Sequence, residues 1–321
     1  MSTSFDQIDT KLINLNSDNA ILNNGTLNSD VTFNFTNILK EELDITHSTI
    51  SILSAQIPVS FYCINTNNNL LMVQYGSTTQ LITITPGNYN ANSLITELTN
   101  RFLSYSFTIT IVINVSSGGL AFTSASALQF KMVGSTCQQV LGFNSNLVSN
   151  GSNVLVMPFP LNLLGSKRLS IKSPNLTCNN TYNSSSNSDT GCIGCIPVDV
   201  PSWALITYSN FTRYELILRQ TIVSQINITI VDEYGHLIDF NNASWTLTLQ
   251  LNIYRKKIKN DTSFEMALQN INKELAVIEN ELRPADETQL IQPKQDQPDF
   301  NEMDNNPDVG DLDLLLYNHQ I

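Results

Sequence analysis

The sequence is short of charge and of the residues that enzymes use most often. Asp, Glu, Lys and Arg make up 14% of the 321 residues, against about 25% in an ordinary soluble domain. Only three histidines occur, His47, His236 and His319, and no serine-hydrolase elbow, phosphate-binding loop, zinc-protease motif or dinucleotide fingerprint accompanies them. Because no catalytic set can be assembled from these residues, we expect a protein that is not an enzyme and uses no cofactor.

Long apolar runs and a basic, apolar N-terminus are also missing. No uninterrupted apolar segment approaches the ~20 residues that a membrane-spanning helix needs. Residues 1–6 lack the positively charged and apolar parts of a signal peptide. We therefore expect no membrane span, and a protein that is made and kept in the cytosol or in an assembly formed there.

The acidic charge is unevenly distributed. Residues 284–321 contain nine acidic residues and one lysine, which gives −8, so the net charge of −12 leaves −4 for residues 1–283. Neither part offers a basic surface for phosphates, and direct nucleic-acid binding is disfavoured. The polar surface must come mostly from Asn, Ser, Thr and Gln, which suits hydrogen-bonded packing against neighbours. An AT-rich genome is an equally open explanation of the many asparagines.

Short strand-like runs separated by Asn, Gly, Ser and Pro dominate residues 31–254. Apolar and polar residues alternate clearly over 226–230 and 245–253, a period that marks strands with one buried face. Many short strands with turn residues between them predict an all-β fold, a jelly-roll-type antiparallel β-sandwich. The predicted strands are 31–35, 49–58, 70–75, 80–85, 107–115, 121–123, 129–133, 154–157, 169–171, 204–208, 214–218, 225–232 and 245–254.

Two short helices are predicted within this β region. Leu94, Leu98 and Phe102 recur at helical spacing, with Asn90 or Asn92 as the N-cap. A second helical turn is expected at residues 136–141, ended by Gly142.

The domain plan that follows has four parts. Residues 1–30 are expected to be an N-terminal arm, and residues 31–260 the jelly-roll-type β domain with a Cys-, Asn- and Ser-rich insertion at about 174–197. Residues 261–283 form an amphipathic heptad helix, which Pro284 ends. Residues 284–321 form an acidic flexible tail with an apolar docking peptide at its end.

The C-terminal apolar residues are the predicted partner-binding residues. On the helix they are spaced 4, 3, 4, 3 and 4 residues apart, which is typical of a coiled-coil seam or of a helix that packs on its own β domain. The apolar tip suits docking into a partner groove, or it is a frayed terminus. These residues are Phe264, Leu268, Ile271, Leu275, Ile278 and Leu282 on the helix, and Leu312, Leu314, Leu315, Leu316 and Tyr317 at the tip.

Three cysteines lie close together in the sequence. Cys178, Cys192 and Cys195 are the candidate metal ligands, and the last two have zinc-knuckle spacing. Zinc normally takes four ligands, so Cys63 or Cys137 would have to approach, and we expect no metal. A Cys178–Cys192 or Cys178–Cys195 disulfide and thiols in a reducing cytosol remain as alternatives.

Residues 232–236 (DEYGH) carry acidic side chains next to a glycine. The alternating ligands of a calcium-binding loop are lacking. We interpret the segment as a hairpin turn in which Gly235 supplies a positive φ.

Four segments, in a consistent order, resemble the penton and minor capsid proteins of virophages, polinton-like viruses and giant DNA viruses. They are residues 53–65 (LSAQIPVSFYCIN), 82–89 (ITITPGNY), 141–143 (LGF), and 231–241 (VDEYGHLIDFN) leading into 245–251 (WTLTLQL). The resemblance covers about residues 31–254 and implies a jelly-roll shell component without catalysis. Its implied role is penton, as a pentamer, or cementing minor capsid protein. The implied partners are the major capsid protein and other capsid subunits, in a virion assembled in the host cytoplasm.

A receptor- or carbohydrate-binding β-sandwich is the alternative function, with a β-sandwich hydrolase as a third. A recognition module would carry aromatic residues exposed in loops. Here Phe33, Phe35, Phe107 and Tyr214 fall in strand-like runs, where we expect them to pack in the core.

Overall fold

The computed structural model describes residues 5–39, 45–176, 191–212, 214–218, 222–256 and 262–281. The chain divides into two units, residues 1–257 and 258–321, and each is described by itself. The strands are β1 (Phe5–Asn16), β2 (Ile21–Leu22), β3 (Asp30–Leu39), β4 (Ile45–Pro58), β5 (Leu70–Tyr75), β6 (Thr78–Thr83), β7 (Ile109–Ile113), β8 (Leu120–Ser124), β9 (Leu128–Lys131), β10 (Leu147–Val148), β11 (Val154–Val156), β12 (Arg168–Lys172), β13 (Cys192–Pro197), β14 (Leu205–Ser209), β15 (Leu216–Ile217), β16 (Val223–Val231) and β17 (Thr246–Lys256). The helices are α1 (Ala91–Ser104), α2 (Gln138–Leu141) and α3 (Thr262–Glu281).

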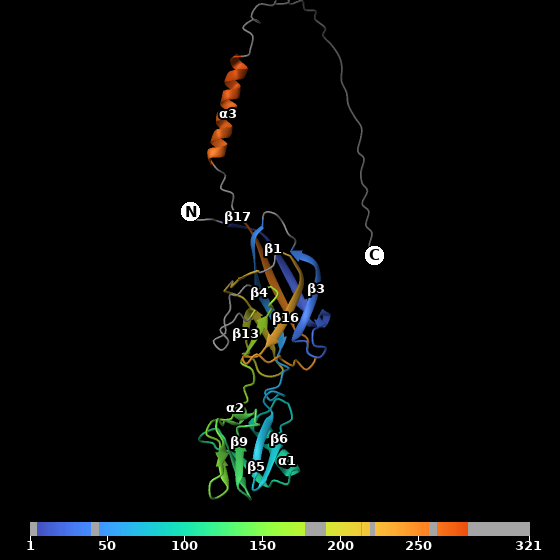
Figure 1. Ribbon diagram of the computed structural model, residues 1–321, viewed down its shortest axis with the longest axis vertical. Coiled ribbons are helices and arrows are strands. Elements are labelled where there is room, and N and C mark those ends of the chain that lie inside the picture. Colours follow the sequence, from blue (N-terminus) through green and yellow to red (C-terminus); the bar gives the residue numbers. More distant parts are fainter. Residues whose placement is uncertain are drawn as a thin grey trace, which may run out of the picture. The chain divides into compact units, whose positions relative to one another are not determined.

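The first unit contains a jelly roll (Figure 1). One sheet has the order β1-β17-β4-β14, with β15 also paired to β4, and the other has the order β13-β12-β16-β3-β2. Numbering the eight main strands β1, β3, β4, β12, β13, β14, β16 and β17 in chain order gives sheets 1-8-3-6 and 5-4-7-2. This alternation between two antiparallel sheets is the double Greek key of a jelly roll. The predicted all-β sandwich is confirmed.

Strand register follows from the alternating apolar pattern. On β17, Leu247, Leu249 and Leu251 are buried against the opposite sheet. Ile13 and Leu15 of β1 lie opposite Leu249 and Leu247, so the first and last strands present their apolar residues to the same core. Because side chains alternate between faces, a slip of one residue would move this whole set to solvent.

Residues before β3 do not form the loose arm that their polar composition predicts. β1 pairs with β17 along its length, and only every second residue of its central part is apolar and buried. Asn14, between the buried Ile13 and Leu15, is exposed, and so is the apolar Leu12, so the segment shows no regular alternation that would predict a strand. Part of the predicted Cys-rich insertion is also regular, because residues 192–197 form β13 and pair with β12.

The residues that lie between β4 and β12 in the sequence form an inserted body with its own core. Its two small sheets have the orders β10-β9-β5-β6 and β11-β8-β7, and Figure 1 shows strands of this body with α1 and α2 at its margins. α1 starts with a capping box, in which the Asn90 side chain accepts from the Ser93 N–H and Ser93 Oγ accepts from the Asn90 N–H. The sequence predicted both helices of this body and all its strands except β10, but not its separate core.

Glycine is required where α2 ends. Gly142 has a φ of +83°, and a Cβ added there would lie 2.3 Å from the carbonyl oxygen of Phe159. Only glycine tolerates both the left-handed backbone and this approach. The predicted stop at Gly142 is confirmed.

Helix α3 in the second unit matches the predicted heptad helix closely. Leu268, Ile271, Leu275 and Ile278 are each between 50% and 54% exposed. The side chain of Phe264, residue Leu282 and the terminal residues 312–317 lie outside what the structure describes. Among the described helices, none combines the length and apolar character needed to cross a bilayer.

Trp245 is the largest side chain that the jelly roll buries completely. Its indole N–H donates to the Asn28 carbonyl at 2.8 Å, and its backbone N–H donates to Ser17 Oγ at 3.0 Å. The ring packs edge-to-face on Phe33, with centroids 6.2 Å apart. Trp245 thus ties the start of β17 to the segment before β3.

We expect Trp245→Phe to lower the free energy of unfolding by about 1–3 kcal/mol, because a buried carbonyl loses its donor. The matched control is Trp203→Phe, since Trp203 is 72% exposed and loses little burial on unfolding. Urea unfolding followed by circular dichroism measures both variants. Equal midpoints for the two would contradict this role of Trp245.

Candidate functional site

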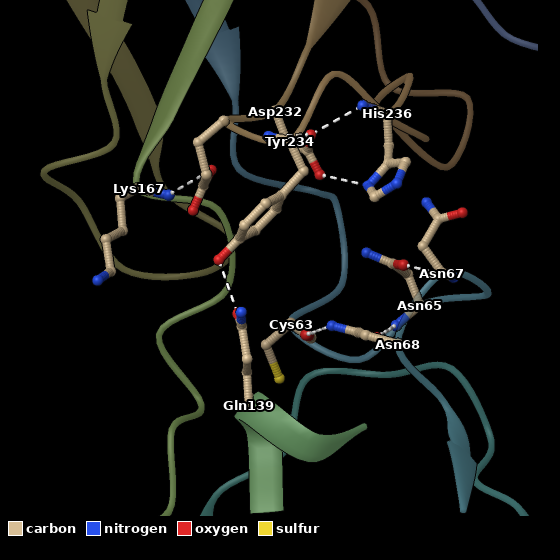
Figure 2. A network of polar contacts seen from close by, with 10 residues as sticks. Cys63, Asn65, Asn67, Asn68, Gln139, Lys167, Asp232, Tyr234 and His236 are labelled. Carbon is tan, nitrogen blue, oxygen red and sulfur yellow. Dashed lines mark hydrogen bonds and ion pairs between the residues drawn. The ribbon is translucent and has the colours of Figure 1, made fainter. Parts of the chain in front are cut away.

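The turn between β16 and β17 lies beside the inserted body and lines a cavity of about 230 Å³. Most of the lining residues are polar, with amides from Asn65, Asn67, Asn68, Gln138 and Gln139 and acidic groups from the turn. Figure 2 shows the side chains of both bodies around this space. We call it the junction pocket.

The turn that borders the junction pocket is organised by one buried carboxylate. Asp232 Oδ1 accepts from the N–H groups of Tyr234 and His236, both at 2.8 Å, and Oδ2 lies 3.1 Å from His236 Nδ1. The Asp232 N–H donates to the His236 carbonyl at 2.9 Å, and Gly235 has a φ of +91°. The predicted hairpin turn with a positive-φ glycine is confirmed.

The opposite side of the junction pocket is an asparagine-rich turn. Asn68 Oδ1 accepts from the Asn65 N–H at 2.7 Å, and its amide donates to the Cys63 carbonyl at 3.0 Å. Asn65 Oδ1 in turn accepts from the Asn67 N–H at 2.9 Å. These amides hold the chain where it leaves the jelly roll, so part of their hydrogen-bonding capacity is structural.

One side-chain hydrogen bond crosses the junction directly. The Tyr234 hydroxyl donates to Gln139 Oε1 at 2.8 Å (Figure 2). Glu233 Oε2 accepts from the Lys167 N–H, in the segment that returns to β12. The pocket therefore presents amides, carboxylates and a phenol, which suit hydrogen-bonded recognition of a small polar molecule. Cys63 Sγ bonds instead to the backbone of Gly87 and Tyr89.

A second group of polar side chains is the thiol pair of β13. The Sγ atoms of Cys192 and Cys195 are 3.7 Å apart, and Ser170 Oγ lies 3.8 Å from Cys195 Sγ. The hydrogen bond from Cys192 lowers the pKa of Cys195 to about 6, against the effect of burial and with help from Ser170 and Arg168. The same hydrogen bond, followed by burial, raises the pKa of Cys192. Of the two thiols, Cys195 is therefore the one that ionises at the lower pH.

The third predicted cysteine, Cys178, lies outside the described residues, so its pairing stays a prediction. Within the described ranges, no three His, Cys, Asp or Glu side chains cluster as metal ligands would. The two histidines of this part make other contacts. His47 stacks on Tyr254, with ring centroids 4.7 Å apart, and His236 bonds to Asp232 in the turn.

Apolar side chains are exposed along the edge formed by β14, β15 and their flanking loops, which we call the β14–β15 edge. Phe211 is 91% exposed, and Tyr214, expected in the core, is 53% exposed. Phe33 and Phe107 are buried as predicted, and Phe35 is partly buried. The surface residues of this edge are Trp203, Leu205, Phe211, Tyr214 and Ile217.

Sequence reasoning missed this edge because single aromatics carry little periodicity. The available signal was local, since Phe211 stands between Asn210 and Thr212 in a segment without alternation. An apolar residue inside a polar loop has no strand face to bury it.

We expect alkylation of Cys195 by iodoacetamide to become half-maximal near pH 6, because only the thiolate reacts. In Cys192→Ala the donor is gone, and the midpoint should move up toward that of an ordinary thiol. Cys137→Ala is the control, since burial raises the pKa of Cys137 to about 12 and removes it from the reaction. Peptide mass spectrometry after timed quenching gives the rates. An unchanged midpoint in Cys192→Ala would rule out the Cys192 donor.

Comparison with known proteins gives one family and a number of similar solved structures, among them a mavirus penton protein and a phage capsid protein. No curated protein matches the sequence. The mavirus penton protein crystal structure is 12% identical, with a TM-score of 0.43, over 76% of this chain and 100% of that one. VP17, a capsid protein of bacteriophage P23-77, is 8% identical, with a TM-score of 0.19, over 78% of this chain and 99% of that one. The model of a family of unknown function (DUF5901) matches residues 47–275. The chain belongs to this family.

Proposed function

We propose that the chain is a structural capsid protein of a large icosahedral DNA virus or virophage, and that it acts by packing against other subunits. The observation that carries the proposal is a jelly roll that leaves apolar side chains exposed at an open sheet edge. Jelly rolls occur in viral capsid proteins, lectins and cupins, so the fold limits the possible functions but does not select one of them.

The β14–β15 edge supports assembly as the function. Within the described residues, β14 and β15 pair only with β4, so their outer backbone groups have no strand neighbour. Soluble monomers usually blunt such edges with charge or cover them. Here Trp203, Phe211 and Tyr214 stand exposed beside the edge instead. An apolar patch of this kind marks a surface that buries itself against a partner.

Helix α3 offers a second apolar surface. Its exposed seam repeats the heptad spacing, and a helix of this length is marginal alone in water. We propose that the seam, with Phe264 and Leu282 at its ends and the terminal residues 312–317, contacts neighbouring subunits. The acidic segment between them would hold the apolar tip at high effective concentration near its docking groove.

The segments that resemble capsid proteins occupy the joint between the jelly roll and the inserted body. Ile64 and Gly87 pair through two backbone hydrogen bonds, 2.9 and 3.2 Å long, which join the first segment to the second. The third segment ends α2, and the fourth contains the turn whose Tyr234 reaches α2. The resemblance therefore coincides with one architectural feature, an inserted body fixed on a jelly roll, and this supports the proposal.

The finer role that we propose is penton, with a cementing minor capsid protein as the other assignment. The proposed partners are the major capsid protein and other capsid subunits, in a virion assembled in the host cytoplasm. The native mass of the purified full chain separates the two roles, because a pentamer indicates a penton and a monomer a cementing protein.

Replacing Phe211 by Ser tests the edge. Phe211 is almost fully exposed, so we expect unchanged thermal stability but a clear loss of incorporation into particles. Val115→Ser is the matched control, because Val115 is 94% exposed on the inserted body. Quantitative mass spectrometry of gradient-purified particles measures incorporation. Equal incorporation of both variants would contradict an assembly role for the edge.

Deleting residues 261–321 tests the second unit. The jelly roll and the inserted body have complete cores without it, so the truncated chain should fold with an unchanged melting temperature. Incorporation into particles should fall, because the α3 seam and the apolar tip are gone. Unfolding of the truncated chain would instead assign the helix to the core of the first unit.

A receptor- or carbohydrate-binding module is the second candidate, and the junction pocket is the observation that favours it. Its amides and carboxylates are the groups that bind sugar hydroxyls, and Tyr234 is an exposed aromatic at its border. A glycan array probed with the full chain tests this function. Binding that is lost in Gln139→Ala would favour it over a purely structural role.

A further inference from the structure

The thiol pair lies at a β-bulge. In a regular strand, residues three positions apart point to opposite faces. Here Cys195 pairs with Ser170 and Gly194 with Ile171, but Cys192 pairs with Lys172, so Ile193 is an extra residue. The bulge turns Cys192 and Cys195 to the same side, and their sulfurs come to 3.7 Å.

The backbone between the two cysteines is held against the opposite sheet. A Cβ added to Gly194 would lie 2.7 Å from Ile52 Cδ1 on β4, so a larger residue there would have to displace the end of the Ile52 side chain. Ile193 and Ile196 are both buried in the jelly-roll core. The bulge is therefore a fixed feature of β13, and it keeps the two sulfurs together. A disulfide needs about 2.0 Å between sulfurs, so closing this pair requires a movement of about 1.7 Å.

The pair is also reachable from solvent. A cavity of about 330 Å³ is lined by both cysteines together with Ile52, Tyr208 and Tyr214. Cys195 is exposed, whereas Cys192 is buried. An incoming small molecule would meet Cys195 first, and Cys192 is placed to react second.

We propose that Cys192 and Cys195 form a reversible redox site, which a small-molecule disulfide oxidises to an intramolecular disulfide. The Cys195 thiolate attacks one sulfur of the small disulfide, which breaks its S–S bond and releases one thiolate. Cys192 then gives up its proton and attacks Cys195 Sγ, which forms the protein disulfide and releases the second thiolate. Two protein thiols are oxidised and one small disulfide is reduced to two thiols.

The charge state of the pair fits these roles. Cys195 is the stronger acid of the two, so it is the attacking thiolate near neutral pH. Cys192 keeps its proton until the mixed disulfide has formed, because burial and its hydrogen bond raise its pKa. The lower pKa on the exposed sulfur is the arrangement of a nucleophile followed by a resolving thiol.

A disulfide at this position would fix the bulge on an edge strand. Within the described residues, β13 pairs only with β12, so its other side is open to further strand pairing. Bulges at edges prevent such pairing because they twist the strand away. In the oxidised state a covalent bond would hold the bulge that prevents strand pairing at the β13 edge. In the reduced state only packing would hold it.

Peptide mapping of the full chain tests the site. The protein is incubated with oxidised glutathione, quenched with iodoacetamide and cut with trypsin and an enzyme that cleaves before Asp. Cleavage before Asp189 and Asp199 separates Cys192 and Cys195 from Cys178. We expect peptide 189–198 to be lighter by two hydrogen atoms and unalkylated, and dithiothreitol to restore two alkylation sites.

Single-cysteine variants complete the test. Cys192→Ser should stop at a mixed disulfide of glutathione with Cys195, whereas Cys195→Ser should lose most of the reaction. Cys178→Ser and Cys137→Ser should both retain the 192–195 link at the wild-type rate. Two reduced thiols in peptide 189–198 after oxidation, or a link to Cys178 in its place, would overturn the proposal.

Discussion

The position of β17 between β1 and β4 is the constraint on which the rest of the first unit depends. The last strand of the jelly roll pairs with its first strand and with its third, so segments far apart in the sequence must meet before the sheet is complete. The buried leucines of β17 fix the register on both sides, because a slip would expose them. Trp245 anchors the start of this strand to the segment before β3.

A sandwich fixed in this way has to end at open edges, and the chain treats its edges differently. β13 carries a β-bulge, a feature that discourages further strand pairing. The β14–β15 edge instead carries exposed aromatic side chains. We infer that the β13 edge is protected from strand pairing and that the β14–β15 edge is the one that contacts a partner. The chain as a whole has only 14% charged residues, so charge repulsion opposes its packing against neighbours less than it does for most proteins.

The sequence predicted local structure better than it predicted bodies or surfaces. Alternation over 245–253 predicted a strand, and the spacing of Leu94, Leu98 and Phe102 predicted a helix. Both predictions were possible because an element that buries one face has apolar residues at a regular spacing. The spacing of apolar residues does not show that β5 to β11 share a separate core, because that depends on which strands meet in space. β1 was missed because its buried residues Ile13 and Leu15 are few, are separated by Asn14 and stand in a polar segment. The candidate sites divide in the same way. The turn at 232–236 was predictable from Gly235, whereas the junction pocket needs the inserted body beside it.

The most direct test of the account is oxidative footprinting of the β14–β15 edge in assembled particles and in the isolated chain. If the edge is an assembly surface, Trp203, Phe211 and Tyr214 will be labelled in the isolated chain and protected in the particle, while Val115 serves as the exposed reference. Equal labelling of the three aromatics in both samples, or a chain that never enters a particle, would contradict the claim that this protein works through its exposed edge.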